Sequence, residues 1–223
     1  MGQTPMLDKK HKCFIPCQLF FLFICLNRAP FTIANDQFVY FGFAQANLSL
    51  DGAATITPDG LLELTNGTFN LKGHALYPTP LHFRMSPSGY AQSFSISFVF
   101  SILSAYPDKS ADVELDTNEN SEFQDINGNH VGINMNSLHS VQSHDASFFD
   151  DKTGMFKNLS LISREMMQVW VECDGGATKV DVTLAPIKMA KPARPLLSTI
   201  YDLSTVFTDT TYIGFSSATG VIN

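Results

Sequence analysis

The feature that most constrains the fold of this chain is a nine-residue stretch in which residue types alternate. Residues 93–101 read S-F-S-I-S-F-V-F-S, with a large apolar side chain at every second position. Successive side chains of a β-strand point to opposite faces, so a period of two predicts a strand with one buried face. Such a strand needs partner strands, and the rest of the chain should supply them.

Other segments have the same character and are separated by turn residues. The runs 54–57 and 61–65 flank Pro-Asp-Gly, and the runs 167–172 and 180–184 flank Asp-Gly-Gly, so each pair predicts a hairpin. Further strands are expected at 38–43, 112–116, 131–135 and 211–216. Pro186, Pro192 and Pro195 indicate an edge or a long connection before the last strand. Many short strands without helical periodicity predict an antiparallel β-sandwich or barrel.

Composition is consistent with one such domain and excludes several functions. The 223 residues are 44% hydrophobic and 16% charged, enough apolar side chain for a core and too little charge for a disordered chain. The formal net charge is −7. A nucleic-acid-binding protein would show a basic face, and binding to an anionic membrane surface is disfavoured for the same reason.

Residues 1–34 predict a signal peptide. A basic cluster at 9–12 precedes a mostly apolar run of fourteen residues, Cys13–Leu26, which is too short to cross a bilayer comfortably. Thr32 and Ala34 are small residues suited to cleavage before Asn35. An uncleaved signal anchor and a buried strand with a basic flank are the alternatives. We therefore expect a secreted mature chain of residues 35–223.

The cysteines and the glycosylation motifs agree with secretion. Cys13, Cys17 and Cys25 lie inside the predicted signal, so Cys173 is alone in the mature chain and is expected to be a buried apolar side chain. Trp170 alternates on a predicted strand and is likewise expected in the core, with a stacking platform for sugar as the alternative. Acceptor motifs for N-glycosylation occur at Asn47, Asn66 and Asn158.

The most informative stretch is 113–140, which is rich in carboxylates and amides. Glu114 and Asp116 are two apart on a predicted strand and should share a face. A polar loop with Asn118, Asn120 and Asp125 follows, and His130 opens the next predicted strand. Oxygen donors suit calcium, and a histidine beside carboxylates suits a transition ion such as manganese. A solvated acidic loop is the alternative, because Asp and Asn are ordinary turn residues.

The sequence does not match the common metal-binding and hydrolase motifs. Ser121 stands where an EF-hand needs glycine, and the sequence has neither H-E-x-x-H nor G-x-S-x-G. His130 has no second histidine at ligand spacing. A hydrolase also needs an open metal position and a positioned base, so a metal hydrolase is disfavoured.

The stretch resembles the metal loop of legume lectins, above all that of plant lectin-type receptor kinases. The resemblance rests on E-L-D-T at 114–117, on Asn120 and Asp125, and on N-H-V-G-I at 129–133. It extends to F-G-F at 41–43, G-H-A-L-Y-P at 73–78 and G-F-S-S-A-T-G at 214–220, and so covers the chain from about residue 37 onward. It implies an all-β antiparallel sandwich of the legume lectin jelly-roll, concanavalin A-like type.

The resemblance also implies a site and a function. Glu114, Asp116, Asp125 and His130 would hold manganese, with Ser140 contacting it through water, and Asp116, Asp125, the Asn120 side chain and the Asn118 carbonyl would hold calcium. Asn118, Asn120, Ala218 and Gly220 would contact sugar. The implied function is non-catalytic binding of a carbohydrate or glycoprotein outside the cell; family members also stand at the plasma membrane as receptor kinases. Pairing of two copies through sheet edges stays open, as does the identity of the sugar.

The sequence departs from the family in three places, and the first two lower the expected sugar affinity. Only residues 102–111 separate Ser101 from Asp112, where the family has a G-H-G-[IM]-A-F-F strand, a sugar-binding Asp and a Gly-bearing loop. Asn118 stands where legume lectins often have an aromatic residue. Past residue 223 the family continues with a W-S-F strand and, in receptor kinases, a membrane helix and a kinase. The alternative function is a truncated receptor ectodomain that binds protein or apolar ligands, or acts as a decoy, without binding sugar.

Overall fold

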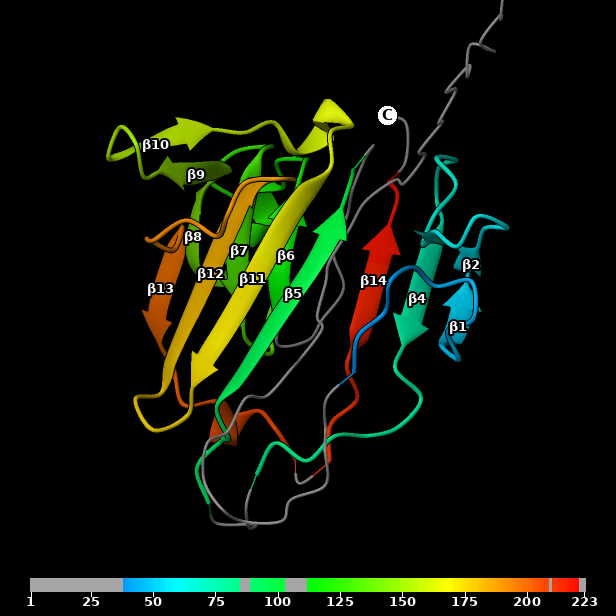
Figure 1. Cartoon of the computed structure of the whole chain (residues 1–223), viewed down its shortest axis with the longest axis horizontal. Coiled ribbons are helices and arrows are strands. Elements are labelled where there is room, and N and C mark those ends of the chain that lie inside the picture. The colour runs from blue at the N-terminus through cyan, green and yellow to red at the C-terminus, as the bar shows by residue number, and fades with distance from the viewer. Residues whose placement is uncertain (1–37, 85–88, 103–111, 209, 221–223) are drawn as a thin grey trace, which may run out of the picture.

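The computed structural model describes residues 38–84, 89–102, 112–208 and 210–220, and its regular structure is almost all β-strand (Figure 1). The strands are β1 (Ser49–Gly52), β2 (Thr55–Ile56), β3 (Leu62–Glu63), β4 (Lys72–Leu76), β5 (Phe94–Phe100), β6 (Asp112–Asp116), β7 (His130–Asn134), β8 (Ser140–Asp145), β9 (Ser147–Asp150), β10 (Met155–Asn158), β11 (Met167–Asp174), β12 (Lys179–Pro186), β13 (Leu197–Ile200) and β14 (Gly214–Ala218). Three single-turn 3-10 helices, η1 (Ser121–Phe123), η2 (Leu161–Ser163) and η3 (Leu203–Thr205), lie in the connections. No helix in these described ranges is long and apolar enough to cross a membrane.

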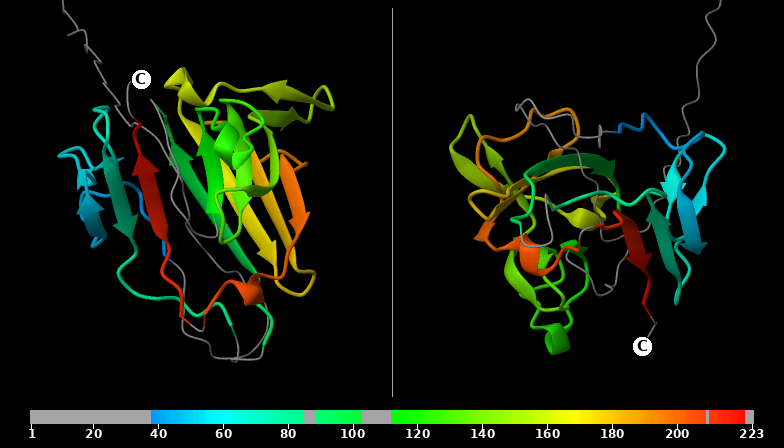
Figure 2. Two further views of the ribbon diagram at one scale, coloured as in Figure 1. Left: turned by 180° about the vertical axis from the view of Figure 1, so that it is seen from behind. Right: turned by 90° about the horizontal axis from the view of Figure 1, so that it is seen from below.

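The strands form antiparallel sheets in two layers (Figures 1 and 2). One layer is the four-stranded sheet β13-β12-β11-β5, in which Val171 of β11 faces Val182 of β12 and Ile96 of β5. The three-stranded sheet β6-β7-β8 lies behind it, and the three-stranded sheet β1-β4-β14 lies to the side of β5. Two small hairpins, β2–β3 and β9–β10, complete the fold.

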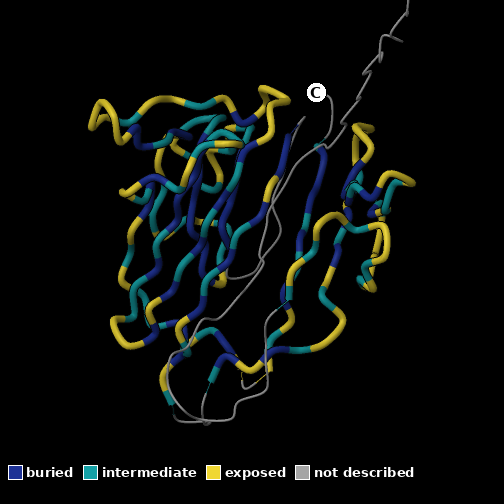
Figure 3. Tube along the Cα trace, in the orientation of Figure 1, coloured by how far each residue is buried: buried dark blue, intermediate teal, exposed yellow. Residues whose placement is uncertain are grey.

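Alternation along the strands builds the core. The even-numbered residues of β5, from Phe94 to Phe100, are buried, and so are the odd-numbered residues of β11, from Met167 to Cys173. Figure 3 shows that most buried residues lie along the strands, whereas many exposed residues lie in the turns and loops. The predicted all-β antiparallel sandwich is therefore confirmed.

Most predicted strands are present, but their limits differ. Both predicted hairpins form, as β2–β3 and β11–β12, and Cys173 is buried as expected. The prediction of a strand at 38–43 is wrong, because residues 38–40 are irregular and 41–43 form bends, and Phe38 stacks on Tyr77 at 4.0 Å between ring centroids. The prediction for Trp170 is also wrong, since it lies half-buried on the outer face of β11.

Several short strands were not predicted from the sequence: β1, β4, β8, β9, β10 and β13. The proline-rich segment does precede an edge strand, because β13 borders the four-stranded sheet. The predicted signal peptide at 1–34 lies outside the described residues.

Candidate metal centre and sugar site

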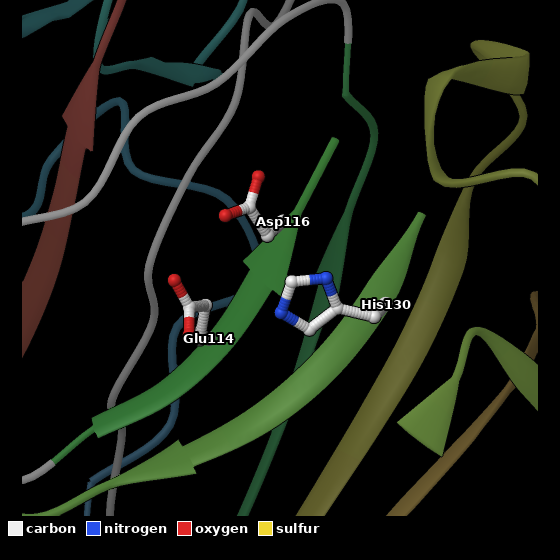
Figure 4. Close-up of side chains that lie close together, drawn as sticks. All are labelled: Glu114, Asp116 and His130. Carbon is white, nitrogen blue, oxygen red and sulfur yellow. The ribbon is translucent and has the colours of Figure 1, made fainter. Parts of the chain in front are cut away.

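Two neighbouring strands bring the predicted metal ligands together. In the antiparallel pair β6–β7, Asp116 faces His130 and Glu114 faces Gly132. One ligand atom from each of Glu114, Asp116 and His130 lies within 4.8 Å of the others, and their side chains point toward one another in Figure 4. All three residues are at most 2% exposed. A group of this kind could hold a metal ion.

Burial disfavours the ionised form of the Glu114 and Asp116 carboxylates. Loss of hydration, the largest cause, raises the pKa of Asp116 to about 8 and also raises that of Glu114. Asp116 Oδ2 is buried and has no hydrogen-bond partner in the described part of the chain. A buried carboxylate without a partner needs a proton or a cation. The donor set, one imidazole and two carboxylates, therefore fits the expected transition ion.

The histidine is held in the tautomer that a metal ligand requires. His130 Nδ1 lies 2.6 Å from the carbonyl oxygen of Asn127, so it donates its proton there and leaves the Nε2 lone pair facing the cluster. Asp125 Oδ1 lies 4.0 Å from this Nε2, which places a third carboxylate at the edge of the cluster. The structure thus brings Asp125 to the three residues on the strands.

The loop after β6 folds back on the same point. The Asn118 backbone N–H donates to Asp116 Oδ1 at 2.7 Å, and the Asn120 backbone N–H donates to Asp125 Oδ2 at 2.6 Å. Asn118 Nδ2 donates to Asn120 Oδ1 at 3.1 Å. Both asparagines are half-buried. These hydrogen bonds connect Asn118, Asn120 and Asp125 of the loop with Asp116 at the end of β6.

Ser140 of β8 lies within hydrogen-bond distance of Glu114 on β6. Two residues of β7 that were not predicted from the sequence, Gly132 and Asn134, make this contact possible. Ser140 Oγ lies 3.2 Å from Glu114 Oε2 and 2.7 Å from Asn134 Oδ1, and Asn134 Nδ2 donates to the same Glu114 oxygen at 3.0 Å. A Cβ on Gly132 would lie 2.2 Å from Ser140 Oγ, so any side chain at position 132 would force Ser140 to move away from Glu114. Residues 130, 132 and 134 share one face of β7, so their spacing in the sequence could have indicated that Gly132 and Asn134 lie beside His130.

The candidate sugar-binding residues are spread over two of the sheets. Asn118 and Asn120 follow β6, whereas Ala218 ends β14 and Gly220 lies just beyond it. Thr219 ties this second segment to the loop before β4, because its hydroxyl donates to the Thr68 carbonyl at 2.7 Å. The glycosylation candidates Asn47, Asn66 and Asn158 are all exposed.

Similarity searches identify the class of protein first. The fold matches a structure of peanut lectin with a nine-residue peptide at a TM-score of 0.64, with 22% identity over 82% of this chain and 88% of that one. It matches basic winged bean lectin with Tn-antigen at a TM-score of 0.62, with 23% identity over 80% of this chain and 86% of that one. The fold is that of a legume lectin β-sandwich.

Sequence comparison then gives the family. The model of the legume lectin domain matches residues 35–112 and 108–223, so the chain belongs to the legume lectin domain family. A rice (Oryza sativa subsp. japonica) protein, L-type lectin-domain containing receptor kinase SIT2, is 44% identical over 256 residues, which cover 97% of this chain. The chain spans 38% of the length of that relative. The family model that matches describes a lectin domain. The kinase in the relative's name is a statement about that relative only.

The family match is interrupted, and the match to the rice relative is longer than the part of this chain that it covers. The two segments of the family match meet at residues 108–112. The 256 aligned residues cover about 216 residues of this chain, so about 40 positions of the rice relative face no residue here.

Proposed function

We propose that this chain is a non-catalytic, carbohydrate-binding lectin module whose binding loop is ordered by a calcium and manganese pair. The observation that carries the proposal is the buried cluster of Glu114, Asp116 and His130 in a chain of the legume lectin domain family, with a carboxylate oxygen that has no hydrogen-bond partner among the described residues. Buried carboxylates of this kind need a proton or a cation, and a cation would hold them in the ionised form, whereas a solvated acidic loop would leave its carboxylates in water.

In this proposal Glu114, Asp116, Asp125 and His130 hold the transition ion, with Ser140 acting through water. Asp116, Asp125, the Asn120 side chain and the Asn118 carbonyl hold calcium. The ions would supply positive charge that keeps the buried carboxylates ionised and the loop fixed. The backbone hydrogen bonds from Asn118 to Asp116 and from Asn120 to Asp125 support a part for this loop in the site, because they hold it against the carboxylates.

We also propose that sugar is bound by Asn120 and Asn118 together with Ala218 and Gly220, and with reduced affinity. The basic winged bean lectin with Tn-antigen supports a sugar as partner. The reduction follows from the block proposed to be missing between Ser101 and Asp112, which the interrupted family match at 108–112 and the 40 or so unmatched positions of the rice relative support. A lost hydrogen bond to a charged group is worth about 1.5–3 kcal/mol, or about tenfold or more in affinity.

The proposed setting is extracellular. Residues 1–34 would be removed as a signal peptide, and residues 35–223 would form the lectin domain. The exposure of Asn47, Asn66 and Asn158 is compatible with glycans at these sites. The family of the curated relatives, receptor kinases with a lectin domain, supports the same location.

The test is titration calorimetry with mannose, glucose and galactose in the presence of both ions. The chain would be compared with a version that carries the block of the rice relative between Ser101 and Asp112. We expect the restored version to bind at least one of these sugars about tenfold or more tightly, and Asn120→Ala to abolish that binding. Asn47→Ala, which changes an exposed asparagine outside the site, is the matched control. Equal affinities with and without the block would contradict the proposed weakening, and sugar binding unaffected by Asn120→Ala would contradict the proposed site.

A further inference from the structure

The register of the three-stranded sheet places a further carboxylate beside the candidate metal centre. In the antiparallel pair β7–β8, His130 faces Asp145, and in the pair β6–β7 the same His130 faces Asp116. Residues that face each other directly project from the same side of a sheet. Asp116, His130 and Asp145 therefore form one row across three strands. Asp116 and His130 are at most 2% exposed, whereas Asp145 is exposed on β8 and is not one of the three clustered residues.

Asp145 reaches His130 through one intervening residue, Asn127. The Asn127 side chain donates from Nδ2 to Asp145 Oδ1 at 2.6 Å, and the Asn127 backbone carbonyl accepts from His130 Nδ1 at 2.6 Å. A hydrogen bond to an ionised carboxylate is roughly twice as strong as a neutral one. Oδ1 of Asn127 accepts from the Asn129 backbone N–H at 2.8 Å, so both ends of the Asn127 amide are engaged. Asn127 is thus held by its side chain while its carbonyl holds the imidazole.

Asn129 anchors the other end of the segment 127–129 to a different part of the chain. Asn129 Nδ2 donates to the Leu159 carbonyl at 2.8 Å, and Asn129 Oδ1 accepts from the Leu161 N–H at 2.9 Å. The Asn129 carbonyl also accepts from the Ala146 N–H at 2.9 Å. These contacts fix residue 129, but none of them reaches the Asn127 side chain. Among the described residues, the contact that holds this side chain from another strand is the one with Asp145.

The position of the Asn127 carbonyl decides which nitrogen of His130 can bind a metal. A carbonyl oxygen only accepts, so the proton of the neutral imidazole lies on Nδ1 and the lone pair lies on Nε2. Figure 4 shows the ring directed toward Glu114 and Asp116. If the carbonyl turned away, the tautomer with the proton on Nε2 would become available, and that proton would block a cation. A partner behind a metal-binding histidine typically changes metal affinity about 10–100-fold.

We propose that Asp145 is a positioning residue, which fixes the tautomer and orientation of His130 through Asn127. This role rests on the metal-binding function proposed above, because the orientation of His130 matters there for the capture of the transition ion. Asp145 itself does not touch the ion. Asn127 and Asp145 line a surface pocket of about 250 Å³, so shortening either side chain leaves no buried cavity and the variants should fold.

The experiment compares the native chain with Asp145→Ala, Asp145→Asn, Asn127→Ala and the double variant Asp145→Ala/Asn127→Ala. The matched control is Asp174→Ala, because Asp174 is also exposed and accepts a hydrogen bond, from the Ala177 N–H, in the other layer. The first readout is the dissociation constant of manganese, measured by titration calorimetry with calcium in excess. The second is the tautomer of His130 in chelator at pH 8, obtained by NMR from the shifts of its two ring nitrogens, with His130→Gln to assign the signals. This second readout needs no metal, and a change confined to overall stability would not move it.

We expect the tautomer with the proton on Nδ1 in the native chain and in Asp174→Ala. Asp145→Ala should show a mixture of tautomers and bind manganese about tenfold more weakly. Asp145→Asn should restore most of both properties, because its amide oxygen still accepts from Asn127. The double variant should bind no more weakly than Asn127→Ala, because Asp145 acts through that residue.

Equal losses in Asp145→Asn and Asp145→Ala would overturn the proposal, since the negative charge rather than the hydrogen bond would then be the cause. Additive losses in the double variant, an unchanged tautomer in Asp145→Ala, or the proton on Nε2 in the native chain would also overturn it. A native chain that binds no manganese would refute the proposed metal site, and the tautomers in chelator would still decide whether Asp145 positions His130.

Discussion

Replacing Asp116 by asparagine should change stability in opposite directions with and without metal. Asp116 is 2% exposed, and burial raises its pKa from the usual 3.8 to about 8. Because the folded-state pKa lies above the unfolded one, the contribution of Asp116 to the stability of the metal-free fold is fully present below about pH 4 and is lost as the pH rises toward 8. Asparagine has nearly the same shape and carries no charge at any of these pH values.

The size of the effect follows from these values. At pH 7, which is about three units above the usual pKa, Asp116 is ionised in the unfolded chain but still largely protonated in the folded chain. This difference lowers the stability of the metal-free fold by about 4 kcal/mol. In Asp116→Asn the new amide replaces Oδ2, which has no partner, and an unsatisfied buried amide costs about 1–3 kcal/mol. The variant should therefore gain about 1–3 kcal/mol in chelator at pH 7, which raises Tm by several degrees. At pH 4 the Asp116 carboxyl costs little, so the unsatisfied amide should make the variant less stable than the native chain, by up to about 1–3 kcal/mol.

The assay is thermal unfolding from pH 4 to 8, once with EDTA and once with calcium and manganese in excess. With metal, the native chain should gain stability that Asp116→Asn lacks, about 2.7 kcal/mol at a hundredfold excess over Kd. The control is Asp51→Asn, which alters an exposed carboxylate of β1. If Asp116→Asn lowers Tm equally in EDTA and in metal, the residue is a structural hydrogen-bond acceptor and the metal site is refuted.

Four further outcomes are expected. Asp125→Ala should remove most of the metal-induced rise in Tm, because Asp125 would contact both ions; a full rise in this variant would exclude it as a ligand. Gly132→Ala should lower both Tm and metal affinity, since its Cβ would lie 2.2 Å from Ser140 Oγ, and adding Ser140→Ala should recover part of the loss; no recovery in thermal melts would contradict this steric cause. Calcium affinity measured by calorimetry should rise by up to about tenfold per pH unit between pH 6 and 8, because protons compete for Asp116; a flat profile would contradict proton competition. N-terminal sequencing of secreted protein should begin near Asn35, and an intact Met1 would contradict cleavage.

Local patterns in the sequence were enough to predict much of the fold and the strand part of the site. The period of two at 93–101 predicted β5 with its buried face correct, and the turn residues predicted both hairpins. The spacing of Glu114 and Asp116 predicted a shared face for the same reason. Strand alternation is a property of the backbone, so it can be read without knowing any partner.

Other features depend on partners that local patterns do not specify. Residues 38–43 have the composition of a strand, but a strand forms only where another strand pairs with it, and this segment is irregular or bent beside Tyr77 instead. Alternation on β11 separated two sets of side chains without saying which was inside, and Trp170 belongs to the outer set. The sequence by itself determined a β-sandwich with two carboxylates on one strand face. Only the tertiary structure decided that β7 lies beside β6, that the Asn127 carbonyl orients His130, and that both carboxylates lose their hydration, because these depend on packing between segments distant along the chain.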